Sequence, residues 1–283
     1  NVGTGITVTA NDSINNSNYT LTQPTGLSAD ITAKALTVTG TTVANKTYDR
    51  TTIATLSGGL LSGVLGSDTV VLTEAGTFAS VNVGTGIAVT ANYSIDNTSA
   101  NNYTITQPTG LSANITAKAL TVSGASAANK TYDGNNTATL SGSLVGVISG
   151  DTVTLSQAGT FASVNAGTGI AVIASDSLGG TSASNYTLTQ PTGLSANISK
   201  ANATVTASSG TGTYNGSLQS VSGFTVSGLV NNETAAVLTG VSASASGTNA
   251  GTYASTASGT DSNYALTFVN GALTINKANL TKV

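Results

Sequence analysis

The side chains that most often carry chemistry are few in this sequence. The chain has 283 residues with no His and no Cys, two Glu and nine Asp, while Ser and Thr are abundant. Without His and Cys, the commonest general base and the usual zinc ligands are missing. No hydroxyl has a visible activating partner, and the carboxylates are scattered. We therefore expect a protein that is not an enzyme, with no catalytic residue and no cofactor.

One pattern of carboxylates recurs, and extracellular modules often use such groups to bind calcium. An acid precedes Thr at a shared position, as Asp68, Asp151 and Glu233. Asp49 and Asp133 each follow a recurring tyrosine. A calcium site needs several converging oxygens, and no Asp-x-Asp-x-Asp cluster occurs. Carboxylates that form turns and start strands explain the pattern better, so we expect no metal site.

Two lysines close to these acids raise the question of an intramolecular Lys–Asn isopeptide bond, which some surface domains of Gram-positive bacteria form. Such a bond needs a buried Lys, an Asn and an acid in every module. Lys46 and Lys130 are the candidates, but Gly212 stands at their position in the last repeat. We therefore do not expect this bond.

Nine aromatic residues recur at fixed positions. Exposed tyrosines could form a platform on which sugars stack. Because the recurrence is strict and the chain has no Trp, we interpret these rings as core anchors whose hydroxyls reach the rim. They are Tyr19, Tyr48, Tyr103, Tyr132, Tyr186, Tyr214, Tyr264, Phe78 and Phe161.

A tandem repeat of roughly 83 residues positions all these side chains. Residues 18–31 recur almost unchanged at 102–115 and 185–198, at offsets of 84 and 83 residues. A diverged copy ends the chain, with 212–216 standing where 130–134 stood. The phase predicts the C-terminal half of a truncated module at 1–34, full repeats at 35–118, 119–200 and 201–277, and the start of another module at 278–283.

The junctions between repeats contain no Gly/Ser-rich or Pro-rich linker. Each carries one lysine, which we expect to keep a short connecting strand solvated and unpaired. The sharper alternative is an ionic or covalent lock between modules. The junction lysines are Lys34, Lys118, Lys200 and Lys277.

Alternation of apolar and polar residues with a period of two predicts strands throughout, and no helical period is convincing. The last two strands of each repeat should form a hairpin. In three copies Pro-Thr-Gly joins them, as at 108–110, and in the fourth Asn270-Gly271 predicts a type I′ turn. A first strand is predicted at 36–38, 120–122 and 203–205, a central one at 68–72 and 151–155, and another at 87–89 and 170–172.

Residues 130–134, 165–168 and 185–201 resemble the YDG-type repeats of very large bacterial exoproteins. Residues 212–216 and 263–268 resemble the related MBG-type module. The resemblance implies YDG-type repeats at 35–118 and 119–200, an MBG-type repeat at 201–277, and a place in haemagglutinin-like adhesins, often secreted by two-partner systems. Arg50 departs from the signature, which has Gly at this turn.

The fold we predict is all-β: a tandem array of small immunoglobulin-like β-sandwich modules. β-Grasp modules are the first alternative, less favoured because no helix is found. A parallel β-helix is the second, less favoured because no shorter repeat lies within the 83-residue period.

The function we predict is a structural stalk of a secreted or surface bacterial adhesin, in which each module advances roughly 35–45 Å. One alternative is a module that binds host or matrix glycans by avidity. Another is a self-associating filament or biofilm matrix component. The expected partners are neighbouring modules. Nucleic acid is excluded by a net charge of −3 without a basic segment, and membrane insertion by the lack of about 18 consecutive apolar residues.

Overall fold

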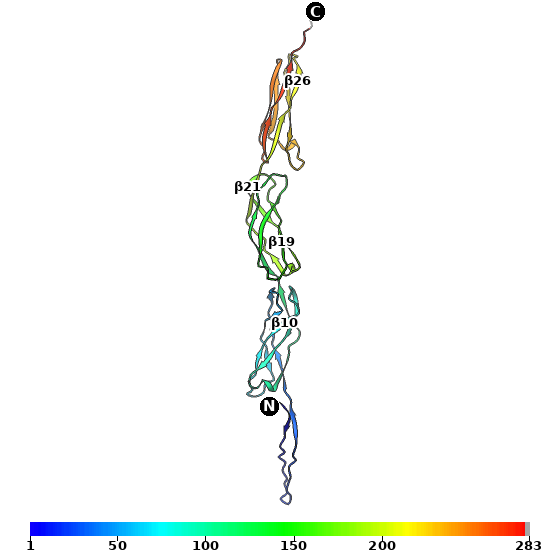
Figure 1. Ribbon diagram of the computed structural model, residues 1–283, viewed down its shortest axis with the longest axis vertical. Helices are drawn as coiled ribbons and strands as arrows, with labels where there is room; N and C mark the ends of the chain where they lie inside the picture. The colour runs from blue at the N-terminus through cyan, green and yellow to red at the C-terminus, as the bar shows by residue number, and fades with distance from the viewer. Residues whose placement is uncertain (281–283) are drawn as a thin grey trace. The chain divides into compact units, whose positions relative to one another are not determined.

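The computed structural model describes residues 1–280. Within them the regular structure is almost entirely β (Figure 1), as the alternating pattern predicts. Helix is limited to three single 3-10 turns, η1 (Ala100–Asn102), η2 (Ala183–Asn185) and η3 (Ala235–Val237). Of the segment 278–283 that we assigned to a next module, residues 281–283 lie outside the described part.

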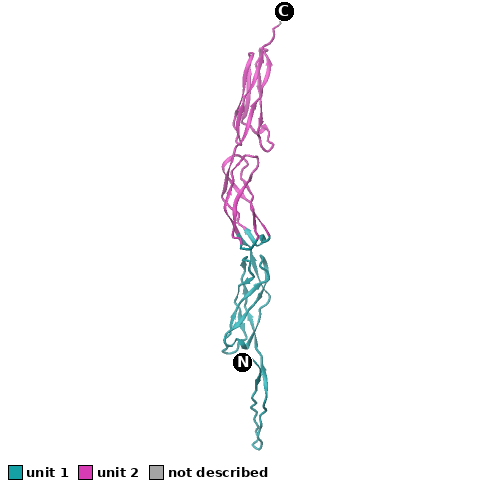
Figure 2. Ribbon diagram, in the orientation of Figure 1, with its two compact units in different colours: residues 1–119, 148–151, 181–187 teal, residues 120–147, 152–180, 188–283 magenta. Residues whose placement is uncertain are grey.

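Contacts divide the chain into two units (Figure 2). Unit 1 contains residues 1–119 together with 148–151 and 181–187. Unit 2 contains residues 120–147, 152–180 and those from 188 onward. Unit 1 therefore includes two short segments of the second full repeat.

Unit 1 begins with two antiparallel strands, β1 (Gly3–Thr7) and β2 (Ser28–Ile31). The first full repeat follows with a three-stranded and a five-stranded sheet. The three-stranded order is β13 (Tyr103–Thr106), β3 (Lys34–Thr39), β8 (Leu60–Ser62). The five-stranded order is β5 (Lys46–Thr47), β14 (Leu111–Thr116), β11 (Gly84–Ala91), β10 (Gly76–Phe78), β6 (Ile53–Ala54). Two small pairs complete it: β9 (Val71–Thr73) with β12 (Ser94–Asp96), and β4 (Thr42–Val43) with β7 (Leu56–Ser57).

The second full repeat has the same strand orders. Its three-stranded sheet is β18 (Leu140–Val145), β15 (Lys118–Ala127), β23 (Tyr186–Leu188). Its five-stranded sheet is β16 (Lys130–Thr131), β24 (Leu194–Ser199), β21 (Gly167–Ala174), β20 (Gly159–Phe161), β17 (Thr137–Ala138), and β19 (Thr154–Ser156) pairs with β22 (Ser177–Gly179).

The last repeat, in unit 2, keeps both large sheets. The three-stranded sheet is β28 (Phe224–Ser227), β25 (Ala201–Ala207), β31 (Tyr264–Val269). The five-stranded sheet is β26 (Gly210–Thr213), β32 (Gly271–Asn276), β30 (Gly251–Gly259), β29 (Val241–Gly247), β27 (Gln219–Ser222). The conserved order across three repeats explains why their aromatic residues occupy equivalent places.

The core of each repeat is built from alternate residues of these strands. The predicted first strand is confirmed: Leu36, Leu120 and Val205 are fully buried on β3, β15 and β25. In the last repeat Val205 belongs to the same buried cluster as Ala243 and Ala257 of the five-stranded sheet. Burying a large aliphatic side chain stabilises the fold by about 1.5–3 kcal/mol.

The predicted hairpin is wrong in its pairing. β13 pairs in parallel with β3, whereas β14 pairs with β11 in the other sheet. The Pro-Thr-Gly segment therefore connects two sheets, although Gly110 has the left-handed φ of 73° that we predicted. In the last repeat Asn270 and Gly271 do not have the positive φ of a type I′ turn. Gly is needed at 271 because a Cβ there would lie 2.5 Å from the carbonyl oxygens of Ala207 and Ser208.

The predicted central strand is confirmed only at its C-terminal end, and it is not central to a large sheet. In 68–72 and 151–155 only the last residues are extended, and the resulting strands β9 and β19 pair solely with β12 and β22. Asp68 and Asp151 lie before these strands, in turns closed by the backbone N–H of each acid. Alternation of side chains identifies a strand's buried face, but the partner strand is chosen by contacts distant in sequence.

Candidate functional site

A carboxylate shared by two tyrosines is the most distinctive polar arrangement in unit 1. The Tyr48 hydroxyl donates to Asp151 Oδ2 at 2.9 Å, and the Tyr186 hydroxyl donates to the same oxygen at 2.6 Å. The two rings meet edge to face, with centroids 5.4 Å apart and planes at 78°. Tyr48 comes from the first full repeat, and Asp151 and Tyr186 come from the second. We call these three residues the first joint.

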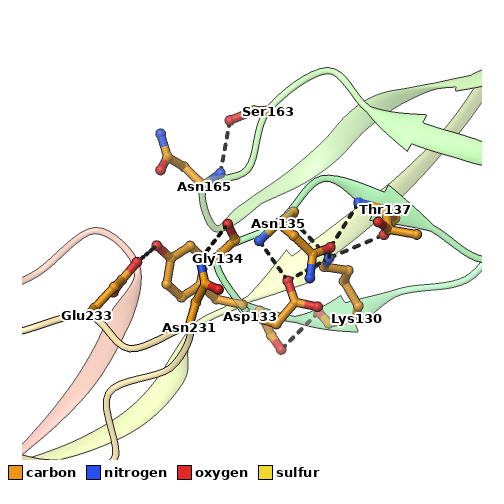
Figure 3. A network of polar contacts seen from close by, with 11 residues as sticks. Lys130, Asp133, Gly134, Asn135, Thr137, Ser163, Asn165, Asn231 and Glu233 are labelled. Carbon is orange, nitrogen blue, oxygen red and sulfur yellow. Dashed lines mark hydrogen bonds and ion pairs between the residues drawn. The ribbon is translucent and has the colours of Figure 1, made fainter.

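Unit 2 contains the same arrangement, built from the second full repeat and the last one. The Tyr132 hydroxyl donates to Glu233 Oε1 and the Tyr264 hydroxyl to Glu233 Oε2, each at 2.6 Å (Figure 3 shows Glu233 with its neighbours). The ring centroids are again 5.4 Å apart, at 80°. We call these residues the second joint. The longer Glu side chain gives one oxygen to each tyrosine, whereas Asp151 uses one oxygen for both.

The strands and turns of each repeat fix these side chains. Tyr48 and Tyr132 follow β5 and β16, and their backbone N–H groups donate to Thr116 and Ser199 at 2.8 Å, which continues the parallel strand pairing. On the other side, the Tyr186 hydroxyl accepts the N–H of Ile148 at 3.1 Å. Each shared carboxylate therefore sits in a loop that is tied to its own tyrosine.

A pair of asparagines accompanies each joint. In unit 1, Asn185 Oδ1 accepts the N–H of Val83 at 2.9 Å, and Asn185 Nδ2 donates to Asn82 Oδ1 at 3.1 Å. In unit 2, Asn263 makes the same two contacts, with Ala166 at 2.9 Å and Asn165 at 3.1 Å. Asn102 repeats the pattern with Val2 and Asn1, at 2.9 and 3.3 Å. Successive repeats are thus connected by backbone-directed hydrogen bonds as well as by the tyrosines.

A lysine braces the turn that carries the first tyrosine of each joint. Lys130 Nζ lies 2.7 Å from Asp133 Oδ1 and donates to the carbonyl oxygens of Asn135 and Thr137 at 2.9 and 3.2 Å (Figure 3). Lys46 makes the matching ion pair with Asp49 at 2.7 Å. Because both acids are about half exposed, each ion pair contributes little, roughly 0–1 kcal/mol. The buried acid that an isopeptide bond requires is missing from this group.

Arg50, the departure from the YDG signature, belongs to the first joint. Its backbone is left-handed, with φ of 67°, as is that of Gly134 at the equivalent position, with φ of 75°. Its Nε lies 3.3 Å from Asp151 Oδ1, and its Nη1 donates to the carbonyl oxygen of Ser149 at 2.7 Å. Arg50 therefore adds a cation to the shared carboxylate, which the second joint lacks at Gly134.

The electrostatics of the joints favour neutral tyrosines beside a charged carboxylate. Burial and the hydrogen bond to Asp151 raise the pKa of Tyr48 to about 12. The hydrogen bond to Glu233 and burial raise the pKa of Tyr132 to about 12. The hydrogen bonds from Tyr186 and Tyr48, with the charge of Arg50, lower the pKa of Asp151. The groups are arranged to bind one another rather than to transfer a proton near neutral pH.

Seven of the nine predicted anchors are buried. Tyr48, Tyr103, Tyr132, Tyr186, Tyr264, Phe78 and Phe161 are 2–6% exposed. The expectation is wrong for Tyr19 and Tyr214, which are 67% and 43% exposed. Tyr19 lies before β2 in a region with no three-stranded sheet, and Tyr214 has no carboxylate of a following repeat against it among the described residues. Tyr103 is buried beside Asp68 of its own repeat, whereas Tyr48 and Tyr132 are buried beside the acidic loop of the next repeat.

The junction lysines are mostly solvated. Lys34, Lys200 and Lys277 are exposed and Lys118 is half-buried, and within residues 1–280 none of the four forms an ion pair. Lys200 Nζ donates to the carbonyl oxygen of Asp261 at 2.5 Å. The lock between repeats is made by the joints and not by these lysines.

Asp68 has the position of Asp151 and accepts the Tyr103 hydroxyl at 2.6 Å. We predicted such acids as turn residues, and the turns are present, but their role as tyrosine acceptors was missed. The signal available in the sequence was the co-occurrence of one acid and one Asn-Tyr pair in every full repeat.

Over residues 1–280, no cluster of three or more potential ligands suggests a metal site, and no helix has the length and apolarity to span a membrane.

The comparisons with known proteins agree with the repeat pattern. The YDG domain family matches residues 32–110 and 116–193, together more than half of the chain, and the MBG domain (YGX type) matches residues 203–274. No curated protein and no solved structure matches the chain. Each joint therefore connects residues of two successive domains, first YDG with YDG and then YDG with MBG. The chain belongs to the YDG domain family, with two YDG domains followed by an MBG domain.

Proposed function

We propose that this chain is part of the structural stalk of a secreted or surface-bound bacterial adhesin of the haemagglutinin-like, two-partner type. Its YDG and MBG domains act as spacers that give length and stiffness and carry a functional region outward. The observation that supports this proposal is the repetition of the tyrosine–carboxylate–tyrosine joint. A contact that recurs at successive domain boundaries fits a role that all the domains share, and holding the domains at a fixed spacing is such a role.

The contacts favour a stiff connection over a flexible one. Each joint combines two hydrogen bonds to a charged group, which are roughly twice as strong as neutral ones, with an aromatic pair worth about 0.5–1.5 kcal/mol. The asparagine pair adds two further hydrogen bonds at each. No Gly/Ser-rich linker lies between the domains.

We further propose that each complete domain is a small immunoglobulin-like β-sandwich. Support comes from the recurring pair of a three-stranded and a five-stranded sheet, and from the shared buried cluster of Val205, Ala243 and Ala257. The parallel pairs β3 with β13 and β5 with β14 are the departure from a purely antiparallel arrangement.

A glycan-binding role finds less support. A sugar-stacking platform needs exposed aromatic faces, whereas the tyrosines of the two joints are buried against each other. The chain would still occupy an extracellular or cell-surface location, where its surface of hydroxyls and amides meets solvent.

Small-angle X-ray scattering on the full chain tests the stalk. Domains that each advance roughly 40 Å should give a radius of gyration of about 35 Å, whereas a globular chain of this length would give about 19 Å. A value near the globular one would refute the proposal.

A matched pair of variants tests the role of the joints. Tyr48→Phe with Tyr132→Phe removes one hydrogen bond from each joint, and should broaden the distribution of particle dimensions in solution. The control pair is Tyr214→Phe, at the repeat position of Tyr48 and Tyr132, with Tyr19→Phe, at the repeat position of Tyr186 and Tyr264. Both of these rings are exposed, so the control pair should leave the scattering unchanged. Equal effects of the two pairs would count against joints as the source of stiffness.

A further inference from the structure

The two joints differ in how a turn of one domain fits the acidic loop of the next. In the first joint the turn carries a large side chain, that of Arg50, and the loop has a glycine, Gly150, facing it. Arg50 places its guanidinium against Gly150, where a Cβ would lie only 2.0 Å from Arg50 Nη1. Hydrogen bonding to Ser149 and pairing with Asp151 hold that guanidinium in place.

In the second joint the larger side chain is on the loop instead of the turn. The turn has Gly134 at the position of Arg50, and the loop carries the side chain of Asn231 (Figure 3). A Cβ at Gly134 would lie 2.7 Å from Asn231 Cβ. Asn231 Nδ2 also donates to the carbonyl oxygen of Gly134 at 3.5 Å. Asn231 aligns with Ser149, so in this joint the bulk comes from the loop residue next to the position of Gly150, and from the opposite domain.

We propose that this exchange of sizes is a pairing code that determines which domain can follow which in the chain. A turn with Arg accepts an acidic loop with Gly immediately before the acid, as in Ser149-Gly150-Asp151. A turn with Gly accepts a loop that carries Asn, as in Asn231-Asn232-Glu233. This inference rests on the proposed spacer function, since a code for order matters only where the joints hold domains together.

A steric conflict acts against the mismatched combination. Arg at 134 would need the volume that Asn231 occupies, and contacts under 3 Å between carbon atoms force one side to move. Displacing the loop would also pull Glu233 away from Tyr132, because the acid is only two residues from Asn231. Specificity then arises from repulsion in the wrong pair as well as attraction in the right one.

The chain offers a matched control for the backbone. Gly216 is the equivalent turn residue of the MBG domain, with φ of 78° and no atom within 4 Å of an added Cβ. Gly216→Arg therefore carries the same conformational cost as Gly134→Arg without the collision. The first YDG domain shows that the turn tolerates Arg, since Arg50 is left-handed there.

Distance measurements by electron paramagnetic resonance on the full chain test the code. The absence of Cys allows two spin labels to be attached at introduced cysteines. Labels at exposed Thr160 and Thr225 report on the second joint, and labels at Thr77 and Thr160 report on the first. We expect narrow distributions in the unmodified chain. Gly134→Arg should broaden only the distance distribution across the second joint. Gly216→Arg should leave both distance distributions unchanged.

Rescue makes the test decisive. Transplanting the first loop into the second joint (Asn231→Ser, Asn232→Gly and Glu233→Asp) should restore a narrow distribution to the Gly134→Arg chain. If that variant misfolds, the reverse exchange is made in the first joint. Placing Asn-Asn-Glu at 149–151 should broaden the distance distribution across the first joint. Adding Arg50→Gly should then make it narrow again.

The outcomes separate the two proposals. Broad distributions at both joints of the unmodified chain would contradict the spacer function and the code with it. Narrow distributions that Gly134→Arg leaves unchanged, or that the transplanted loop does not restore, would overturn the code and leave the spacer function standing.

Discussion

Removing the hydroxyl of Tyr132 should weaken the second joint by a measurable amount. Tyr132→Phe deletes the 2.6 Å hydrogen bond to Glu233 and keeps the ring against Tyr264. Hydrogen bonds to charged groups contribute about 1.5–3 kcal/mol. Glu233 is only partly buried, so water can reach the freed oxygen, and we expect a loss near the lower end, about 1–2 kcal/mol. The matched control Tyr214→Phe should change the stability by less than about 0.5 kcal/mol.

A double-mutant cycle with Glu233→Gln isolates this hydrogen bond. The chain has several domains that need not unfold together, so the probe must report on one of them. A dye on a single cysteine introduced at exposed Thr160 follows the second YDG domain during urea unfolding. The expected coupling energy between Tyr132 and Glu233 is about 1 kcal/mol, roughly a fivefold change in the unfolding equilibrium.

Two results would refute this reasoning. The first is a coupling energy below about 0.3 kcal/mol, within the error of independent sites. The second is an equal loss for Tyr214→Phe, since Tyr214 is exposed and has no carboxylate partner among the described residues.

Three other predictions follow from the burial and the pKa shifts. Raised pKa values of Tyr48 and Tyr132 mean that their contribution to stability is complete below about pH 10 and is lost as the pH rises towards 12, by at most about 3 kcal/mol for each tyrosine; unfolding midpoints measured from pH 9 to 12 check this. The lowered pKa of Asp151 means that its contribution is complete above about pH 4 and is lost at lower pH, so Asp151→Asn should flatten the acid limb of the stability profile. Ile198→Ala should destabilise the second YDG domain by about 2–5 kcal/mol, whereas Ile31→Ala, at the same repeat position but 49% exposed, should have almost no effect on unfolding monitored by circular dichroism.

Local patterns predicted the strands well, because alternation is a property of neighbouring residues. Leu36 and Leu120 are buried at the positions that the period of two indicates. The same pattern could not show that β13 and β14 belong to different sheets, since both strands turn one face to the core whichever strand they pair with. Pairing is decided by strands tens of residues away, such as β3, and no turn motif carries that information.

The candidate site was harder to predict for a related reason. Tyr48 and Asp151 are 103 residues apart and belong to different domains, so their spacing within one repeat says nothing about their contact. Identical sequence also does not guarantee identical burial. Ile31 and Ile115 occupy the same position of nearly identical segments, yet they are 49% and 1% exposed. The difference is that β14 has partner strands on both sides, whereas β2 pairs only with β1.

Arg50 shows what a departure from a repeat signature can reveal. Taken within its own domain, an Arg at a left-handed turn position costs free energy that Gly would avoid. Two groups of the next domain, Ser149 and Asp151, bind this Arg, and its guanidinium lies against Gly150, where a side chain would collide with it. Gly134 keeps the signature, and its following loop carries the bulk at Asn231. In a tandem array, a residue that departs from the repeat signature is therefore best compared with the loop of the neighbouring domain, because the two pack against each other.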